Sequence, residues 1–331
     1  MNRTITMLLG AAIALVMAAP AHATLTYVKG QSGERPVVYV ADDDGTNAHK
    51  LGQGESPAVS PDGRWVAWVA PGDPARVMMR LADRSRKART VVQTAVVGDL
   101  QFSPDSKSLG IIANTRLWVY NIHDRESVKA ASGNIRGFSF SPDSEKVAFG
   151  TAGRNDASGA PSDLFSFDIA SKSRYRITRD RKSLNPLWTS GGIVHDRQKQ
   201  RENDAPTYNL FEIQPDGGSL RRITSLKIGP LMSGLVPLEM SANGKRLLAE
   251  LEGQDISAGF AVNPANGKVR ALTRDFENGF VAADLTADGK TVLGQTGGPV
   301  PSGKHHVATM PYKGGKRTVL VRNATQPDWS R

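Results

Sequence analysis

The sequence predicts an all-β protein, a seven-bladed β-propeller of four-stranded antiparallel blades. One tight-turn motif recurs seven times, about every 45 residues, and this period is typical of propeller blades. Short apolar runs that read as strands flank the turns. After the first 23 residues, no apolar run of adequate length has a helical period. Four short strands in each repeat match one blade of a propeller.

The clearest copy of the motif is Ser60-Pro61-Asp62-Gly63, which has the chemistry of a tight turn between two strands. Proline holds φ at about −65°, aspartate bonds back to the local backbone, and glycine tolerates a positive φ. An apolar residue precedes the Ser or Thr in every copy. The other copies begin at Ser103, Ser141, Thr189, Ser241, Thr286 and Ser330.

The second half of each repeat has the pattern of another hairpin. In the third repeat, residues 163–168 and 175–178 read as its two strands. In later repeats, Asp216-Gly217 and Asn266-Gly267 mark the turns between such strands. Each repeat therefore contains strand, turn, strand and a second hairpin, which is the content of one blade.

The two ends of the chain are expected to share one blade. Residues 24–55 supply the second, third and fourth strands of a repeat but lack a first strand. The missing strand appears at the other end of the chain, in residues 325–331. Six internal blades and this composite blade give a closed ring of seven. Closure would hide the edge strands that an open array exposes.

Residues 1–23 have the features of a secretory signal peptide, with Arg3 before an apolar core and Ala21-His22-Ala23 as a small-x-small cleavage site. The core is too short to span a bilayer, so no stable membrane insertion is expected. The chain has no cysteine, which excludes a lipid-attachment cysteine and disulfides. The sequence thus predicts cleavage near Ala23 and a periplasmic or secreted propeller over residues 24–331.

Residues 57–68, with the sequence PAVSPDGRWVAW, and the closing Arg-Ile-Thr or Ala-Leu-Thr of several repeats resemble the repeat of TolB-type propellers. The resemblance covers essentially the whole chain after the signal. It specifies the fold rather than a function, because such repeats serve binding proteins and accessory domains of enzymes. TolB itself carries an α/β domain before its propeller, and we expect this domain to be absent because the signal runs straight into a strand.

Enzyme signatures are mostly missing. The chain has no G-x-S-x-G elbow and no Walker or dinucleotide glycine pattern that follows a strand and opens a helix. We therefore interpret it as a non-enzymatic binding scaffold without a cofactor. The resemblance also includes a lyase group in which a seven-bladed propeller with histidine-bound metal cleaves acidic pectin fragments. It leaves a metal-dependent lyase or hydrolase-like enzyme for an acidic oligosaccharide as the alternative, although no set of metal-ligating histidines can be matched here.

The formal net charge of +10 bears on the partner. An exported protein meets little nucleic acid, so the charge indicates an envelope protein or an acidic glycan instead. A generally basic surface for solubility explains the same composition. We expect a monomer that does not bind nucleic acid.

The longest connections between predicted strands are expected on one face of the propeller, where loops on a rigid scaffold usually bind partners. These connections are residues 151–162, 197–207, 225–236, 274–279 and 294–304. A basic set on this face could bind a sugar acid, a phosphate or an acidic segment of a partner. A solvated surface partly balanced by nearby acids is the alternative. The set comprises Arg154, Arg179, Arg181, Lys182, Arg197, Lys199 and Arg201.

Three acids, Glu239, Asp284 and Asp328, stand two residues before the turn Ser or Thr in the last three repeats. Equivalent positions of neighbouring blades lie around one ring, so we expect these carboxylates to gather near the channel. Together they could hold a cation or a basic side chain, and their crowding would raise at least one pKa. Three unrelated hydrogen bonds to backbone groups are the alternative.

His195 is the best single catalytic candidate, because we expect it at a strand end beside the basic loop. A structural role is commoner for such a histidine. The adjacent His305 and His306 should point to opposite sides of a strand, which is poor geometry for binding one metal. The sequence therefore assigns no catalytic residue and no metal ligand.

Overall fold

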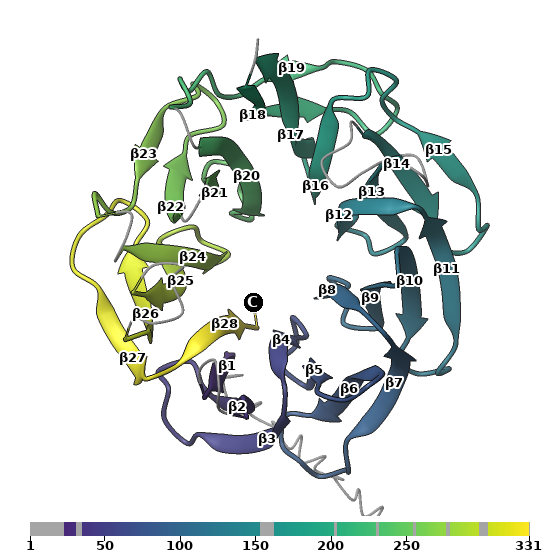
Figure 1. Ribbon diagram of the computed structural model, residues 1–331, viewed down its shortest axis with the longest axis vertical. Coiled ribbons are helices and arrows are strands. Elements are labelled where there is room, and N and C mark those ends of the chain that lie inside the picture. The colour runs from purple at the N-terminus through teal and green to yellow at the C-terminus, as the bar shows by residue number, and fades with distance from the viewer. Residues whose placement is uncertain are drawn as a thin grey trace, which may run out of the picture.

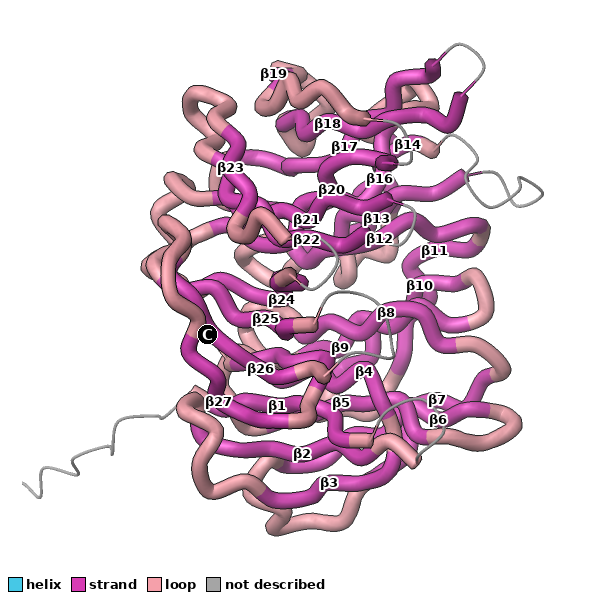
Figure 2. The backbone as a smooth tube through the Cα atoms, turned by 60° about the vertical axis from the view of Figure 1, so that its left-hand side comes forward, coloured by secondary structure: helices cyan, strands magenta, loops and turns pink. Residues whose placement is uncertain are grey.

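The computed structural model describes residues 23–30, 35–152, 162–201, 204–229, 232–253, 256–275, 279–297 and 304–330. These residues form β-strands, turns and loops without a helix (Figure 2). The sheets follow one another around a central axis, with one strand of each nearest the middle (Figure 1). Within the described residues no helix could cross a membrane. The architecture is that of a β-propeller, as the repeat predicts.

Four sheets are built from consecutive strands in antiparallel order. The first contains β4 (Glu55–Val59), β5 (Trp65–Ala70), β6 (Ala75–Leu81) and β7 (Arg89–Thr94). The second contains β8 (Val97–Phe102), β9 (Ser108–Ala113), β10 (Arg116–Asn121) and β11 (Ser127–Ser132). The third contains β12 (Asn134–Phe140), β13 (Lys146–Ala152), β14 (Asp163–Asp168) and β15 (Arg174–Arg176). Another contains β24 (Phe280–Leu285), β25 (Thr291–Thr296), β26 (His306–Pro311) and β27 (Thr318–Arg322).

A larger sheet of eight strands lies between the third sheet and that of β24–β27. It begins with β16 (Ser183–Thr189), β17 (Gly192–Arg201), β18 (Asp204–Ile213) and β19 (Arg221–Arg222). It continues with β20 (Met232–Met240), β21 (Leu247–Gly253), β22 (Ile256–Val262) and β23 (Val269–Ala271). The two halves repeat the four-strand order of the other sheets. They are joined by one parallel pair, Tyr208 of β18 with Gly234 of β20.

The last strand of the chain lies in the same sheet as the first three strands. This sheet has the order β28 (Thr325–Trp329), β1 (Thr24–Lys29), β2 (Val37–Asp42) and β3 (His49–Gln53). β28 pairs antiparallel with β1, so that Asp328 stands opposite Thr26. The hydroxyl oxygen of Ser330 accepts a hydrogen bond of 2.7 Å from the backbone N–H of Thr24. The C-terminus lies near the middle of the ring (Figure 1).

The recurring turn owes its shape to a Ser hydroxyl at its first position. Ser60 Oγ donates to Asp62 Oδ1 and accepts from the N–H of Trp65 at 2.9 Å, while Gly63 adopts a φ of 71°. Side chains of the turn therefore form hydrogen bonds with backbone groups that have no backbone partner in a tight turn. The same hydroxyl-to-acid or hydroxyl-to-amide bond recurs at Ser103, Ser141, Ser241 and Thr286.

A β-bulge interrupts the pairing of the innermost strand of every unit in the described chain. The register shifts in β4, β8, β12, β16, β20, β24 and β28, in each case against the second strand. A bulge adds one residue to one strand, bends that strand and re-aims the side chains beyond it. Residues toward the start of these strands therefore do not follow the simple alternation that the sequence suggests.

The core lies between neighbouring sheets, whose apolar faces pack on each other. Phe138, Phe140 and Phe149 of the third sheet, for example, pack against Leu117 and Val119 of the second. Gly110 of β9 lies directly under this contact, since a Cβ there would stand 2.2 Å from the Phe138 ring. Glycine at this position lets the aromatic layer approach the backbone of the neighbouring sheet.

One of the expected long loops is a hairpin instead. Residues 197–201 belong to β17 and residues 204–207 belong to β18, and the pairing of these strands extends to Arg201 and Asp204. The prediction of a loop was wrong because a run of charged and polar residues was taken as irregular, although a strand exposed on both faces has the same composition. The expected loops 151–162 and 294–304 fall mostly outside the described residues.

Candidate functional site

The innermost strands define two ends of the ring. In the hairpin of β16 and β17, Thr189 and Gly192 pair beside the recurring turn, whereas Ser183 and Arg197 pair at the opposite end. We call the first end the turn end and the second the loop end. Residues that begin an innermost strand lie at the loop end, and residues that finish it lie at the turn end.

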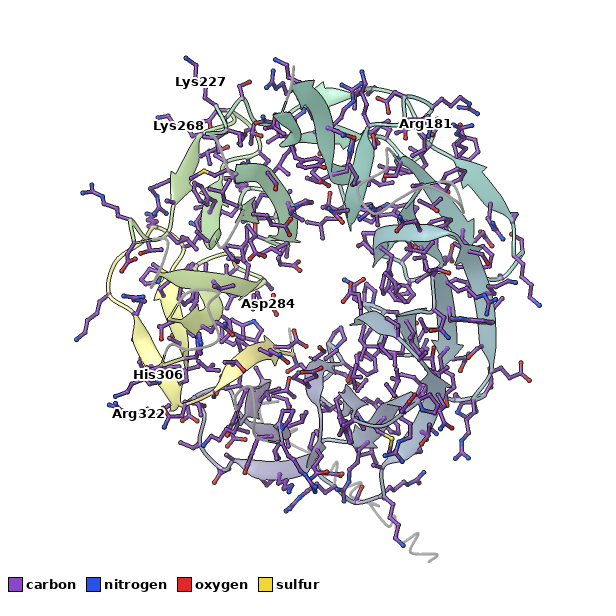
Figure 3. All side chains as sticks on the ribbon, viewed as in Figure 1. Arg181, Lys227, Lys268, Asp284, His306 and Arg322 are labelled. Carbon is purple, nitrogen blue, oxygen red and sulfur yellow. The ribbon has the colours of Figure 1, made fainter. Side chains whose placement is uncertain are left out.

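The structure brings most of the predicted basic set together at the loop end. Ser183, which follows Lys182, pairs with Arg197, and the N–H of Gln198 donates to the carbonyl of Lys182 at 2.7 Å. Figure 3 places Arg181 at the periphery of the ring. We call this group the basic edge and define it as Arg179, Arg181, Lys182, Arg197 and Lys199. Arg154 and the side chain of Arg201 lie outside the described residues.

Two acids beside the basic edge whose side chains are described already have partners. Asp180 accepts two hydrogen bonds from the guanidinium of Arg197, whose charge also lies 5.3 Å from the centre of the Phe211 ring. Asp163 binds the guanidinium of Arg176 at 2.6 Å and accepts from the backbone N–H of Arg181. Arg197 is therefore half-buried and held in place, so its first role is structural.

The other members of the basic edge project into solvent. Arg179, Arg181, Lys182 and Lys199 are exposed. Within the described part of the chain, no acidic side chain forms an ion pair with Arg179, Lys182 or Lys199. Three unneutralised charges on a rigid hairpin and its preceding loop can attract an anionic surface.

The turn end holds a pocket of about 610 Å³ on the ring axis. Its wall combines turn prolines, aromatic rings and the ends of innermost strands, and Glu239 and Asp328 are part of it. Asp328 Oδ2 also accepts a hydrogen bond from the backbone of Val59. Asp284 is not in the wall, although its neighbours Ala283 and Leu285 are. It is 1 % exposed and accepts from the N–H of Leu285 at 2.6 Å.

Sequence reasoning missed a further acid of this pocket, Asp99 of β8. Solvent reaches this side chain from the channel, but the surrounding protein partly desolvates the carboxylate. This desolvation raises its pKa to about 6. The backbone N–H of Leu100 donates to it at 2.8 Å, which opposes the rise. Asp99 lies in the bulge of β8, between Val97 and Leu100, so strand alternation in the sequence does not place it in the pocket.

His195 is buried in the interior of β17 and does not lie at a strand end. Burial lowers its pKa to about 4, so the ring is neutral at pH 7. Nδ1 lies 3.1 Å from the carbonyl oxygen of Asp196, and the ring stacks on Phe211. The expected strand-end position was wrong because β17 is longer than its apolar part. With 0 % exposure, His195 cannot reach a substrate in this structure.

Asp196, the next residue, belongs to a polar cluster that the sequence did not reveal. It is 2 % exposed, and Asn185 Nδ2 donates to its Oδ2 at 3.2 Å. Burial raises the pKa of Asp196 to about 8, so the carboxyl group keeps its proton at pH 7. Asn185 occupies the bulge of β16, with a φ of 39°. This contact depends on the bulge, and no local sequence signal encodes it.

His305 and His306 both contact backbone groups. His305 Nδ1 lies 3.1 Å from the carbonyl oxygen of Thr296, and His306 Nδ1 accepts from the N–H of Asn323. Among the described residues, no group of three or more His, Cys, Asp or Glu side chains could hold a metal ion. Such clusters are what a protein-held transition metal requires.

The sequence matches no protein-family model and no curated protein. Solved structures are similar in fold. TolB from Acinetobacter baumannii has a TM-score of 0.58 at 15 % identity, over 92 % of this chain and 82 % of that one. An oligogalacturonate lyase in complex with manganese has a TM-score of 0.63 at 13 % identity, over 91 % and 86 %. The β-propeller domain of the Trilobed protease from Pyrococcus furiosus has a TM-score of 0.65 at 10 % identity, over 91 % and 95 %.

These likenesses concern the fold. Structural neighbours include TolB proteins and other propeller proteins, so the chain has a TolB-like propeller fold. The neighbours include lyases and a peptidase as well as TolB proteins. At such low identity the fold alone does not choose among them.

Proposed function

We propose that this TolB-like propeller is an exported, non-enzymatic binding scaffold whose loop end engages an envelope protein or an acidic ligand. The observation that carries the proposal is the basic edge. Its exposed cations Arg179, Lys182 and Lys199 lack acidic partners in the described chain, while Asp180 and Asp163 beside them are occupied by other groups. A rigid surface with unneutralised charge favours association with an anionic partner.

The scaffold is a closed ring of seven blades in this proposal. We count β16–β19 and β20–β23 as two blades, because among the described residues one parallel pair, Tyr208 with Gly234, joins their strands. The sheet of β28, β1, β2 and β3 is then the blade that joins the two ends of the chain. A closed ring holds its loops in fixed relative positions, which a binding surface built from several blades requires.

An envelope location fits the same proposal. The first 23 residues have the pattern of a cleaved secretory signal, and the chain has no cysteine. The periplasm or the medium offers anionic polymers and envelope proteins, and a chain with a net charge of +10 is suited to both. We expect the exported form to begin near Thr24, at the start of β1.

Retention on immobilised polygalacturonate tests the binding surface. The test variant carries Arg179→Ala, Lys182→Ala and Lys199→Ala, and it spares Arg197 because Arg197 binds Asp180. The control variant carries Lys129→Ala, Lys245→Ala and Lys268→Ala, which removes the same charge from exposed positions elsewhere. The test variant should elute at clearly lower salt than the wild type, and the control close to it.

The same three proteins can be used to capture partners from envelope extract. A partner that depends on the basic edge should be recovered with the wild type and the control but not with the test variant. Equal elution and equal recovery for all three proteins would show that the basic edge is only a soluble surface, and the proposal would fail.

The similarity to oligogalacturonate lyase structures favours one alternative, a metal-dependent lyase acting on an acidic oligosaccharide. The described residues contain no cluster of metal ligands that would support it. Incubation with oligogalacturonate and manganese should give no rise in the absorbance of unsaturated products. A rise that a chelator abolishes would replace the scaffold proposal by the enzyme.

The pocket at the turn end is a second candidate contact. Asp99, Glu239 and Asp328 give it an acidic wall among turn prolines and aromatic rings, so it suits a cationic group of a partner. Calcium, manganese and a lysine-rich peptide should each be titrated separately. Stabilisation by the peptide alone would favour a basic side chain, and the absence of any response would remove the pocket from the proposal.

A further inference from the structure

Two further cations lie beside the basic edge. They are Arg222, in the outermost strand β19, and Lys227, in the link that follows this strand. Both side chains are exposed. Within the described part of the chain, neither forms an ion pair with an acid. We call Arg222 and Lys227 the outer pair.

The ring of Phe211 brings Arg222 next to the basic edge. Phe211 of β18 pairs with Arg222, whose guanidinium lies 5.9 Å from the centre of the ring. The guanidinium of Arg197 lies 5.3 Å from the same centre. Arg222 Nε donates to the carbonyl of Thr224 at 2.6 Å, which holds the group in place. Because Asp180 neutralises Arg197, the positive charge left at this point is that of Arg222.

The side chain of Asn209 fixes the position of Lys227. Asn209 Oδ1 accepts from the N–H of Leu226 at 2.8 Å, and Asn209 Nδ2 donates to the carbonyl of Leu226 at 3.2 Å. Asn209 in turn pairs with Arg197 of β17. Lys227, the next residue after Leu226, therefore lies at the loop end beside β18. Figure 3 places it at the periphery of the ring.

Cations therefore stand on both sides of the hairpin of β17 and β18, which lie between β16 and β19. Arg179 and Lys182 precede β16, and the carbonyl of Lys182 accepts a hydrogen bond from β17. Lys199 lies on the hairpin itself, and the outer pair lies on the side of β19. Three strand spacings, about 14 Å in all, separate β16 from β19. The loop end of this unit thus presents positive charge across its whole width.

This surface lacks the apolar groups that protein partners usually need. In the described chain the exposed large apolar side chains are Val96, Tyr175, Leu220 and Val319, and none of them belongs to the basic edge or the outer pair. Protein interfaces are built around a core of aromatic and apolar anchors. The edge strand β19 has two residues, too few for a peptide to add to the sheet as a strand. The surface suits a partner that carries many like charges and little apolar surface.

We propose that the loop end of β16–β19 binds an acidic polysaccharide, which lies across the hairpin and contacts the basic edge on one side and the outer pair on the other. The inference rests on the proposed function and names the chemical class of its partner. A chain of uronic acids carries a carboxylate on every sugar, so it reaches cations on both sides at once. The two sides then act as linked sites, and linkage raises affinity without a new kind of contact.

The length of the polysaccharide tests the inference. Calorimetry on the full chain at low salt should compare galacturonate oligomers of two and of ten residues. Per binding register, the decamer should bind at least about tenfold more tightly than the dimer, because the dimer does not span the hairpin. High salt should remove most of this gain. Equal affinity per register, or no binding of the decamer, would overturn the inference.

Variants then show which cations the decamer contacts. Arg222→Ala with Lys227→Ala removes the outer pair and should weaken binding of the decamer at least about tenfold. Arg116→Ala with Lys245→Ala is the control, since it removes the same charge from exposed positions of other units and should leave the affinity close to that of the wild type. If the loss of Arg222 prevents folding, Lys227→Glu alone decides, because it reverses a charge at an exposed position.

The outcomes separate this inference from the proposed function. The basic-edge variant, with Arg179→Ala, Lys182→Ala and Lys199→Ala, should also weaken binding of the decamer. If it does so and the outer-pair variant does not, the inference is overturned and the scaffold function stands. If neither variant changes the affinity, both proposals fail. Tighter binding of a glutamate decapeptide, or of phosphatidylglycerol vesicles, would show a peptide or a lipid surface as the partner and would also overturn the inference.

Discussion

Asp328, in the last strand of the chain, accepts a hydrogen bond of 2.6 Å from the backbone N–H of Val59, 269 residues earlier. Asp328 lies in β28, which pairs with β1, while Val59 ends β4 of the following sheet. The bond therefore joins the sheet that holds both ends of the chain to its neighbour. Because the acceptor is a carboxylate, this bond is stronger than one between neutral groups.

Removing this carboxylate should destabilise the protein. Asp328→Ala leaves the N–H of Val59 without its acceptor, and we expect a loss of about 1–3 kcal/mol in the free energy of unfolding. Urea denaturation followed by tryptophan fluorescence measures this change. Asp43→Ala, at an exposed position, serves as the control and should be close to neutral. Equal stability of the two variants would contradict the role given to Asp328.

Deleting residues 325–331 tests the whole strand. The deletion removes β28 together with the Ser330 hydroxyl that binds Thr24, and it exposes the edge of β1. We expect a marked fall in melting temperature, larger than that of Asp328→Ala. An unchanged transition would mean that these residues do not close the ring.

The recurring turn should be sensitive to its hydroxyl. Ser141 Oγ donates to Asp143 and accepts from the N–H of Lys146 at 2.9 Å. Ser141→Ala removes both bonds and should cost about 1–2 kcal/mol of stability. Ser141→Thr keeps the hydroxyl, as Thr286 does naturally in its own turn, and should cost less. Ser141→Ala should unfold at a lower urea concentration than Ser141→Thr. The reverse order would contradict the role given to the hydroxyl.

Gly110 should not tolerate a side chain. An added Cβ would stand 2.2 Å from the Phe138 ring, so Gly110→Ala must displace an aromatic residue of the core. We expect a loss of about 1–3 kcal/mol from overpacking. Gly191→Ala is a matched control, because its Cβ would come no closer than 3.5 Å to another group. Thermal unfolding of both variants provides the comparison, and similar melting temperatures would contradict the packing described.

The protonated Asp196 predicts how stability depends on pH. Its folded pKa of about 8 lies above its ordinary value of 3.8, so the native state retains a proton that the unfolded state releases. The contribution of Asp196 to the free energy of unfolding is fully present below about pH 4, and it decreases as the pH rises toward 8. Asp196→Asn cannot ionise and keeps a similar shape. Relative to the wild type, this variant should therefore become more stable between pH 5 and pH 8.

Urea midpoints at several pH values measure the difference between the two proteins. A constant difference across this range would show that Asp196 is ionised in the native protein.

The sequence predicts the propeller well, because the turn chemistry is local. Ser60, Asp62 and Gly63 can be recognised as a turn from their types alone. The structure shows the expected bond of the aspartate to the backbone, since the N–H of Arg64 donates to Asp62 Oδ1, and it shows the positive φ of Gly63. The missing first strand of residues 24–55 is likewise visible in the repeat pattern. Both inferences depend on neighbours along the chain and need no knowledge of packing.

The sites were harder to predict, because bulges and long-range packing decide them. Asp284 fits the same sequence position as Glu239 and Asp328, yet it is buried and bonds to Leu285. The hydrogen bond from Asn185 of β16 to Asp196 of β17 depends on the bulge of β16, and such bulges recur in the innermost strands. No periodicity in the sequence encodes these bulges. His195 was wrongly expected at a strand end, because the polar residues that extend β17 beyond it show no alternation of apolar residues.

Hydrogen exchange measured by mass spectrometry is the most direct test of binding at the loop end. The wild-type protein should be compared alone, with polygalacturonate and with any partner captured from envelope extract. Binding should slow exchange in peptides that cover residues 179–201, and peptides around the turns at Ser60, Ser103 and Ser141 should be unchanged. Slower exchange confined to the turn peptides, with residues 179–201 unaffected, would contradict the proposed binding surface.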